Sequence, residues 1–145
     1  MTASKPTAHN RIVMLVTDSL ETAVMCKGTF QNSGCELICE SPIYAIQTQA
    51  VLGAALVIID ANLSHINRIQ LCAELRGKST CPILMLVPEY NGNQVIDVYN
   101  AGADECLLTP ISPAFLVIKA ISWLMRRRWV GDNACPIQVM SGFQA

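Results

Sequence analysis

The sequence predicts an α/β domain in which helices cover both faces of a single, doubly wound parallel sheet. Short, uninterrupted apolar runs recur along the chain, and a stretch with helical spacing of its apolar residues follows each of them. The connections are short, so consecutive strands run parallel and are joined by helices. The runs consist mainly of Ile, Val, Leu and Met, which is typical of strands that are buried on both faces.

The apolar runs are the predicted strands, and they cover residues 11–16, 35–40, 55–60, 82–87 and 105–109. A helix is predicted after each strand, over residues 20–32, 42–52, 68–76, 92–101 and 113–128. Capping or first-turn residues begin four of these helices: Ser19, Pro42, Asn91 and the Ser112-Pro113 pair. A glycine ends four of them: Gly34, Gly53, Gly77 and Gly102.

The composition is that of one compact folded domain. Hydrophobic residues make up 52% of the 145 residues and charged residues only 14%, which excludes a disordered activator or a polar linker. The longest apolar stretch, residues 51–59, is far shorter than the roughly 20 residues that cross a bilayer, and no signal peptide is expected. A net charge of −1 gives no general attraction to nucleic acid.

Several chemically reactive side chains can be explained by a structural role, without a function in catalysis or binding. The seven cysteines form no pair of CxxC motifs and most lie in apolar runs, so we expect buried, reduced thiols in a cytoplasmic protein. His65 stands alone in a predicted loop, and we expect it to be solvent-exposed without a role as a metal ligand. Arg126, Arg127 and Arg128 end the last helix, where cations complement its negative end. The alternative is that these arginines mark the junction to an output domain.

The functional edge of such a sheet is the one where the carboxyl ends of its strands meet. No glycine-rich phosphate loop follows the first strand, so a nucleotide site is unsupported. The residues predicted at this edge are Thr17, Asp18, Asp60, Val87 and Thr109.

Motifs around this edge, in the right order along the chain, resemble those of response-regulator receiver domains. Residues 60–68, DANLSHINR, match the family's phosphoacceptor loop, usually DxxMPxMDG. The other matches are the fourth strand at residues 82–88, the turn at residues 101–105 and the Thr109-Pro110 pair in place of Lys-Pro. The resemblance implies a five-stranded, flavodoxin-like receiver domain over residues 11–128, with residues 129–145 as a linker or tail.

The resemblance also assigns roles to individual residues. Asp60 is the expected phosphoacceptor, and Asp18 is the remaining member of the acidic pair that binds Mg²⁺ in the family. Because Mg²⁺ takes hard oxygen ligands, Asp18, Asp60 and a carbonyl of Asn62 imply a metal site. With so few ligands the site should bind Mg²⁺ weakly. We expect Asp60 to lie beside Asp18 in a shallow cleft that is open to solvent.

Four positions depart from the family pattern. Thr17 replaces an acid, Val87 replaces the Thr or Ser that contacts the phosphoryl group, Thr109 replaces the lysine, and Cys106 replaces the aromatic switch residue. Losing the lysine alone removes a charge-assisted hydrogen bond of roughly 1.5–3 kcal/mol. The loss of one acid together with the lysine leaves the formal charge unchanged but removes the geometry of phosphoryl transfer. The pattern therefore predicts an atypical receiver in which phosphorylation at Asp60 is weak or absent.

The predicted function is signal-transduction regulation by protein–protein contact, without enzymatic activity. The expected partners are a histidine kinase, an output domain, or a second copy bound through the fourth helix, fifth strand and fifth helix. Tyr99, Phe115 and Trp123 are candidates for this surface, although core burial is the expected position of each. DNA would be bound only through a further domain, such as a winged helix, of which residues 136–143 resemble a first strand.

Two alternative functions remain open at this stage. The first is a phosphorylation-competent receiver from a DNA-binding transcriptional regulator. The second is a small-ligand or redox-sensing module that uses the pocket or a thiol such as Cys106.

Overall fold

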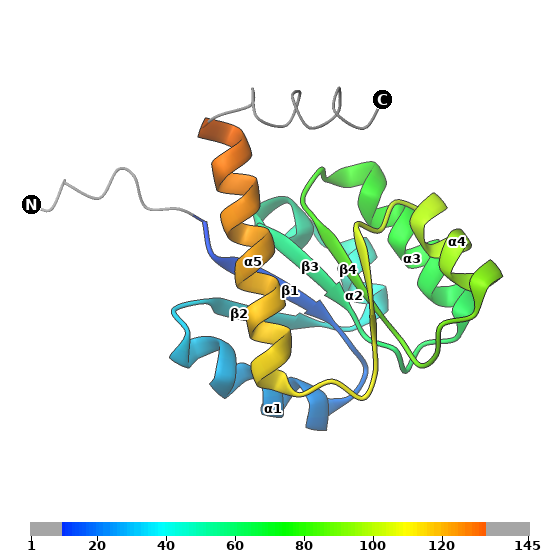
Figure 1. Ribbon diagram of the computed structural model, residues 1–145, viewed down its shortest axis with the longest axis horizontal. Helices are drawn as coiled ribbons and strands as arrows, with labels where there is room; N and C mark the ends of the chain where they lie inside the picture. Colours follow the sequence, from blue (N-terminus) through cyan, green and yellow to red (C-terminus); the bar gives the residue numbers. More distant parts are fainter. Residues whose placement is uncertain (1–9, 133–145) are drawn as a thin grey trace, which may run out of the picture.

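The structure, a computed structural model, describes residues 10–132 of the chain (Figure 1). The strands are β1 (Ile12–Val16), β2 (Glu36–Glu40), β3 (Leu56–Ile59), β4 (Ile83–Val87) and β5 (Glu105–Leu108). The helices are α1 (Leu20–Asn32), α2 (Pro42–Gln47), the 3-10 helix η2 (Ala50–Gly53), α3 (His65–Lys78), α4 (Gly92–Asn100) and α5 (Pro113–Asp132).

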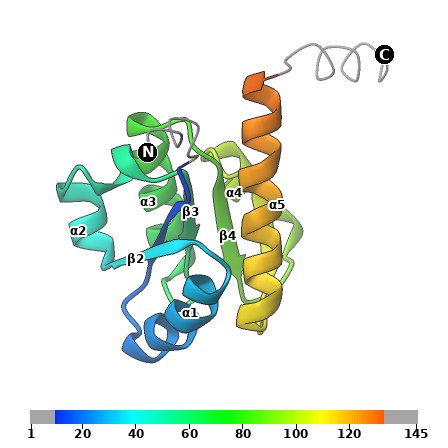
Figure 2. The same cartoon turned by 90° about the vertical axis from the view of Figure 1, so that its left-hand side faces the viewer.

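The strands form one parallel sheet with the order β2-β1-β3-β4-β5. Helices α1 and α5 cover one face, and α2, α3 and α4 cover the other (Figure 2). The predicted α/β, doubly wound sheet of the flavodoxin-like type is therefore confirmed. The chain leaves β1 toward β2 and then returns on the other side of β1 to form β3. The topological switch point, where ligands bind in open α/β sheets, thus lies between β1 and β3.

The central strands are buried on both faces, as their apolar runs predict. All residues of β3 and β4 are buried, and in β1 only Ile12 is partly exposed. Two core clusters result, one on each face of the sheet. No helix within residues 10–132 is long and apolar enough to span a membrane.

Two predicted helices end elsewhere than expected. The predicted helix over residues 42–52 is divided into α2 and η2, because Thr48 takes an extended conformation and its hydroxyl accepts a hydrogen bond from the Ala50 amide. Helix α5 continues to Asp132 and so passes the expected domain boundary at residue 128. The predicted further strand over residues 136–143 lies outside the described residues.

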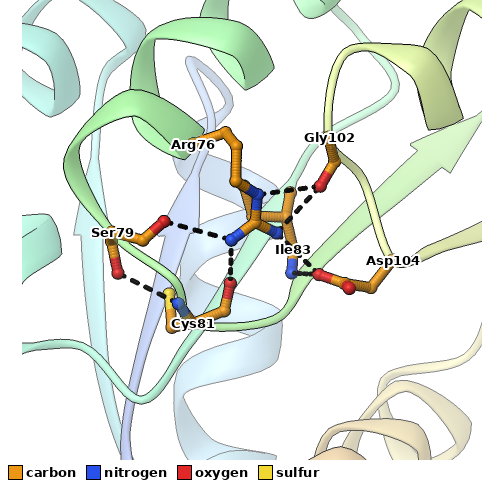
Figure 3. A network of polar contacts seen from close by, with 6 residues as sticks. All are labelled: Arg76, Ser79, Cys81, Ile83, Gly102 and Asp104. Atoms are coloured by element: carbon orange, nitrogen blue, oxygen red, sulfur yellow. Dashed lines mark hydrogen bonds and ion pairs between the residues drawn. The ribbon is translucent and has the colours of Figure 1, made fainter.

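An arginine network joins three elements at the amino-terminal edge of the sheet (Figure 3). The Arg76 guanidinium on α3 donates to three main-chain carbonyl oxygens, those of Ser79, Cys81 and Gly102. It also pairs with Asp104 at 2.7 Å, and the same Asp104 oxygen accepts the Ile83 amide at the start of β4. Gly102 has a φ of +115°, and a Cβ there would lie 2.8 Å from Cγ of Arg76.

Tyrosine hydroxyls bind the free edge of β5, which pairs only with β4. The Tyr99 hydroxyl accepts the Cys106 amide at 3.1 Å, and the Tyr90 hydroxyl donates to the Cys106 carbonyl at 3.4 Å. Both main-chain groups of Cys106 are therefore occupied by side chains of the same chain.

Candidate functional site

Thr17 and Asp60 meet at the carboxyl edge of the sheet. Val16 of β1 is in register with Ile59 of β3, so the residues that follow them lie side by side. The Thr17 hydroxyl donates to Oδ2 of Asp60 at 2.6 Å, and both side chains are buried. The same Thr17 oxygen accepts the Ser19 amide at 2.9 Å, which fixes its orientation at the start of α1.

The expectation that Asp60 is open to solvent is wrong. Its exposed fraction is only 6%, and the Thr17 hydroxyl and the side-chain amide of Asn62, at 3.3 Å, both donate to Oδ2. Asp18 is exposed, and its carboxylate makes no hydrogen bond or ion pair with any residue that the structure describes. Asp60 is thus a buried carboxylate that accepts two hydrogen bonds, whereas Asp18 is exposed.

The positions that carry the phosphoryl contacts in the family hold no free polar group toward Asp60. Val87 is buried at the end of β4. The Thr109 hydroxyl donates to the Val87 carbonyl at 3.1 Å, and the Thr109 amide donates to the same oxygen at 2.9 Å. Thr109 therefore extends the pairing of β5 with β4 instead of supplying a charge to the site.

Arg68 is a buried residue near this edge that the sequence analysis missed. It belongs to the first turn of α3, its exposed fraction is 3%, and burial lowers its pKa. Its Nη1 donates to the carbonyls of Ala61 and Leu63 in the loop that follows Asp60. The signal was present in the motif comparison, because Arg68 stands where the acceptor-loop motif has glycine.

Burial opposes ionisation of Cys106 and of several other described thiols. Burial raises the pKa of Cys106, and the opposing effects of the Tyr99 hydrogen bond and the Arg68 charge do not outweigh it. Burial also raises the pKa of Cys72, to about 11. Of the cysteines within residues 10–132, only Cys39 is partly exposed, and burial raises its pKa as well. This disfavours a redox function for Cys106.

His65 is not the exposed loop residue that the sequence suggested. Its side chain is 21% exposed because it packs at the start of α3, and Nε2 lies 3.3 Å from Oδ2 of Asp97 on α4. This contact joins the first turn of α3 to α4.

The residues expected to hold Mg²⁺ make a poor set of ligands. No group of three or more His, Cys, Asp or Glu side chains within the described residues could hold a metal ion. Oδ2 of Asp60 accepts two hydrogen bonds, and Asn62 directs its amide nitrogen toward that oxygen. Asp18, the other oxygen of Asp60 and a carbonyl of Asn62 supply only part of the near-octahedral oxygen coordination that Mg²⁺ demands, so this set fits weak binding.

Exposed apolar side chains gather on α4, β5 and α5. This α4–β5–α5 surface comprises Tyr90, Ile96, Tyr99, Leu108 and Phe115. The expected core burial is wrong for Tyr99 and Phe115, which are 45% and 47% exposed, whereas Trp123 is partly buried. A hollow of about 550 Å³ lies between β5 and the start of α5.

Charged groups border this surface. Glu105 accepts hydrogen bonds from Lys119 at 2.8 Å and from the indole of Trp123 at 2.7 Å. The Arg126 guanidinium stacks 4.3 Å from the centre of the Trp123 ring. Burial opposes ionisation of Glu105, but the Lys119 and Trp123 hydrogen bonds outweigh it, so the pKa of Glu105 lies below its usual value.

Solved structures share this fold, although no family model matches the chain. The receiver domain of the Francisella response regulator 1452 superposes with a TM-score of 0.71 at 21% identity, covering 81% of this chain and 99% of that one. A two-component response regulator from Clostridium difficile superposes with a TM-score of 0.70 at 22% identity, covering 82% and 98%.

Curated sequences show a similar relationship. The DNA-binding response regulator MtrA of Mycobacterium tuberculosis is 27% identical over 115 residues, which are 79% of this chain and 50% of that protein. The uncharacterized transcriptional regulatory protein YclJ of Bacillus subtilis is 23% identical over 120 residues, 82% of this chain and 53% of that protein. The chain thus spans about half the length of these relatives.

Proposed function

Starting from the premise that this chain is a response-regulator receiver domain, we propose that it regulates signal transduction by protein–protein contact while phosphorylation at Asp60 is weak or absent. Receivers are signalling modules, and the proposal assigns this one no enzymatic activity. Its setting is the cytoplasm.

The hydrogen bond from Thr17 to Asp60 carries the proposal. In phosphoryl transfer a carboxylate oxygen must reach the phosphorus while cations neutralise the developing charge. Here Oδ2 is buried and accepts two hydrogen bonds, and no cationic side chain within residues 10–126 forms an ion pair with Asp60. An acyl phosphate on Asp60 would find neither a lysine at position 109 nor a hydroxyl at position 87.

Phosphodonor labelling tests this proposal. Acetyl phosphate with Mg²⁺ should modify only a small fraction of the wild-type chain, as measured by intact mass. The triple variant Thr17→Asp, Val87→Thr and Thr109→Lys restores the family's groups and should be modified much more. Asp60→Asn in both backgrounds is the control for the site of modification. Rapid, stoichiometric labelling of the wild type that Asp60→Asn abolishes would overturn the proposal.

Weak binding of Mg²⁺ by Asp18, Asp60 and Asn62 is part of the same proposal. Asp18 is exposed and free to turn, whereas Asp60 offers only the oxygen that accepts no hydrogen bond. Calorimetric titration should give a dissociation constant in the millimolar range or weaker for the wild type and tighter binding after Thr17→Asp. Tight binding by the wild type would contradict it.

The contact surface in this proposal is the α4–β5–α5 surface, and its occupant is a second copy of the chain. The surface combines exposed apolar side chains with both acidic and basic groups, so two copies related by a two-fold axis can match opposite charges. The acidic group on this surface is Glu105, and the basic ones are Lys119 and Arg126.

Sedimentation velocity at micromolar to hundred-micromolar concentration measures this association. Phe115→Asp should abolish the dimer, because Phe115 is 47% exposed and lines the hollow beside β5. Val24→Asp is the matched control, since Val24 is 65% exposed on α1 at a distance from it. A strict monomer over this range would contradict self-association and leave a kinase or an output domain as the occupant to be assayed.

The relatives also support a proposal about the recipient of the signal. MtrA is named as a DNA-binding response regulator, and this chain matches only about half of it. A DNA-binding output domain, in the same polypeptide or in another, is therefore the proposed recipient of the signal.

A further inference from the structure

The first turn of α3 carries two buried nitrogens without hydrogen-bond partners. They are Nδ1 of His65 and Nε of Arg68, and no other buried side-chain nitrogen or oxygen in the described part of the chain lacks a partner. Residues three apart lie on the same side of a helix, so both nitrogens belong to one side of this turn. The turn directly follows the loop that contains Asp60.

Arg68 is buried as a charged group without a carboxylate partner among the described residues. Burying a guanidinium costs several kcal/mol unless its interactions compensate. The hydrogen bonds that it makes run from Nη1 to the Ala61 and Leu63 carbonyls, within the loop after Asp60. Arg68 therefore closes this loop back onto the helix that it leads into.

The buried side of α3, to which Arg68 belongs, packs against α4 and β5. The buried residues of α3 form one stripe, namely Arg68, Leu71, Cys72 and Leu75. The last three belong to the core cluster that contains Val98 of α4 and Cys106 of β5. The charge of Arg68 also acts on the Cys106 thiol, which is consistent with their proximity.

We infer that Arg68 is a positioning residue that holds the Asp60 loop, the first turn of α3 and the α4–β5 packing in one arrangement. The His65 contact with Asp97 adds a second connection between the same turn and α4. The α4–β5–α5 surface thus keeps its shape without a phosphoryl group on Asp60. This inference deepens the proposed function and rests on its assignment of that surface as the site of contact.

Hydrogen exchange of the full chain tests the inference with Arg68→Met, which keeps the apolar stem but removes every donor. Amides of residues 61–68 and of α4 should exchange at least roughly tenfold faster than in the wild type. Arg68→Lys keeps a charge and donors, and should restore part of the protection.

Arg76→Met is the matched control. Arg76 is also on α3 and also donates to main-chain carbonyls, but it does so at the opposite edge of the sheet. Its loss should accelerate exchange around residues 79–83 and 102–105, and leave the Asp60 loop protected. Unchanged exchange in Arg68→Met, or the same uniform acceleration in both variants, would overturn the inference.

If Arg68→Met does not fold, a second measurement is available, in which a larger residue at position 106 is combined with a smaller one at position 68. Cys106→Tyr should lower the melting temperature in the wild type, because Cys106 is buried in the core cluster that packs against the α3 stripe. The same substitution should cost less, or stabilise, in the Arg68→Gly background. An equal loss in both backgrounds would overturn the inference.

The two proposals fail in different ways. Ready labelling of Asp60 by acetyl phosphate would refute the proposed weak phosphorylation and leave the exchange results standing. Unchanged exchange in Arg68→Met would refute the positioning role and leave the labelling results standing.

Discussion

At the scale of single residues, Thr17 determines the environment of Asp60. A threonine at the end of β1 donates a 2.6 Å hydrogen bond where an acid would repel, so the Asp60 carboxylate is buried without a cation beside it. The hydroxyl is itself oriented by the Ser19 amide that begins α1. One substitution thus exchanges a metal ligand for a hydrogen-bond donor.

Thr17→Val tests this interaction, because valine has nearly the same shape without the hydroxyl. Removing a hydrogen bond to a buried carboxylate should lower the free energy of unfolding by about 1.5–3 kcal/mol, measured by urea denaturation. Thr29→Val is the control, since the Thr29 hydroxyl makes only a long, exposed contact at 3.5 Å and its loss should change little. Equal effects of the two substitutions would show that the Thr17 contact contributes nothing specific.

The sequence predicted that Thr17 and Asp60 follow neighbouring strands, but not that they form a buried hydrogen bond. Thr17, Asp60 and Val87 end three neighbouring strands, and strand ends can be read from apolar runs. The burial of Asp60 depends on a side-chain rotamer of Thr17, which no periodicity reports. Arg68 was missed because an arginine in the first turn of a helix is ordinarily exposed, and only the packing of α3 against α4 and β5 buries it.

At the scale of elements, the strands could be predicted from the sequence more accurately than the ends of the helices. Apolar runs located all five strands within a residue or two, because burial on both faces leaves an uninterrupted pattern. The helix ends were harder to predict: Thr48 interrupts the predicted second helix, and α5 continues past residue 128. The exposure of the apolar residues on α4 and α5 could not be predicted from the sequence, because a helix face that binds a partner has the same apolar composition as one that packs into the core.

The turn between α4 and β5 should be intolerant of a side chain. Gly102→Ala places a Cβ against an Arg76 side chain that its hydrogen bonds hold in place, at a φ that alanine rarely adopts. The expected loss of stability is about 1–3 kcal/mol by thermal or urea unfolding. Gly28→Ala is the contrasting variant, because nothing lies within 4 Å of the added methyl in α1. It should stabilise the chain by about 0.5–1 kcal/mol, and a loss there would contradict this interpretation.

At the scale of the whole molecule, the link between β5 and α5 makes stability depend on pH. The pKa of Glu105 is lowered in the folded chain from the usual value of 4.5. A carboxyl of this kind stabilises the fold above its unfolded-state pKa, and the contribution is lost as the pH falls through the folded-state pKa. The window of loss therefore lies below about pH 4.5.

Glu105→Gln should lower the free energy of unfolding at pH 7 by about 1 kcal/mol, since the Lys119 and Trp123 contacts lose their charge. The difference from the wild type should shrink in urea titrations below about pH 4.5 and vanish once Glu105 is protonated. Glu74→Gln, at an exposed position of α3 without a side-chain hydrogen bond to any described residue, serves as the control. A difference that persists unchanged at pH 3 would mean that Glu105 stabilises by shape and not by charge.

The tyrosine hydroxyls on β5 have a consequence for the behaviour of the protein at high concentration. An open strand edge is a template on which another chain can add a strand, and this is a common route to domain swapping and fibril growth. Because Tyr99 and Tyr90 already bind the amide and the carbonyl of Cys106, an incoming strand would have to displace both before it could pair there. The same apolar region can then bring two folded copies together through side chains, while the β5 edge at Cys106 is protected against pairing with a further strand.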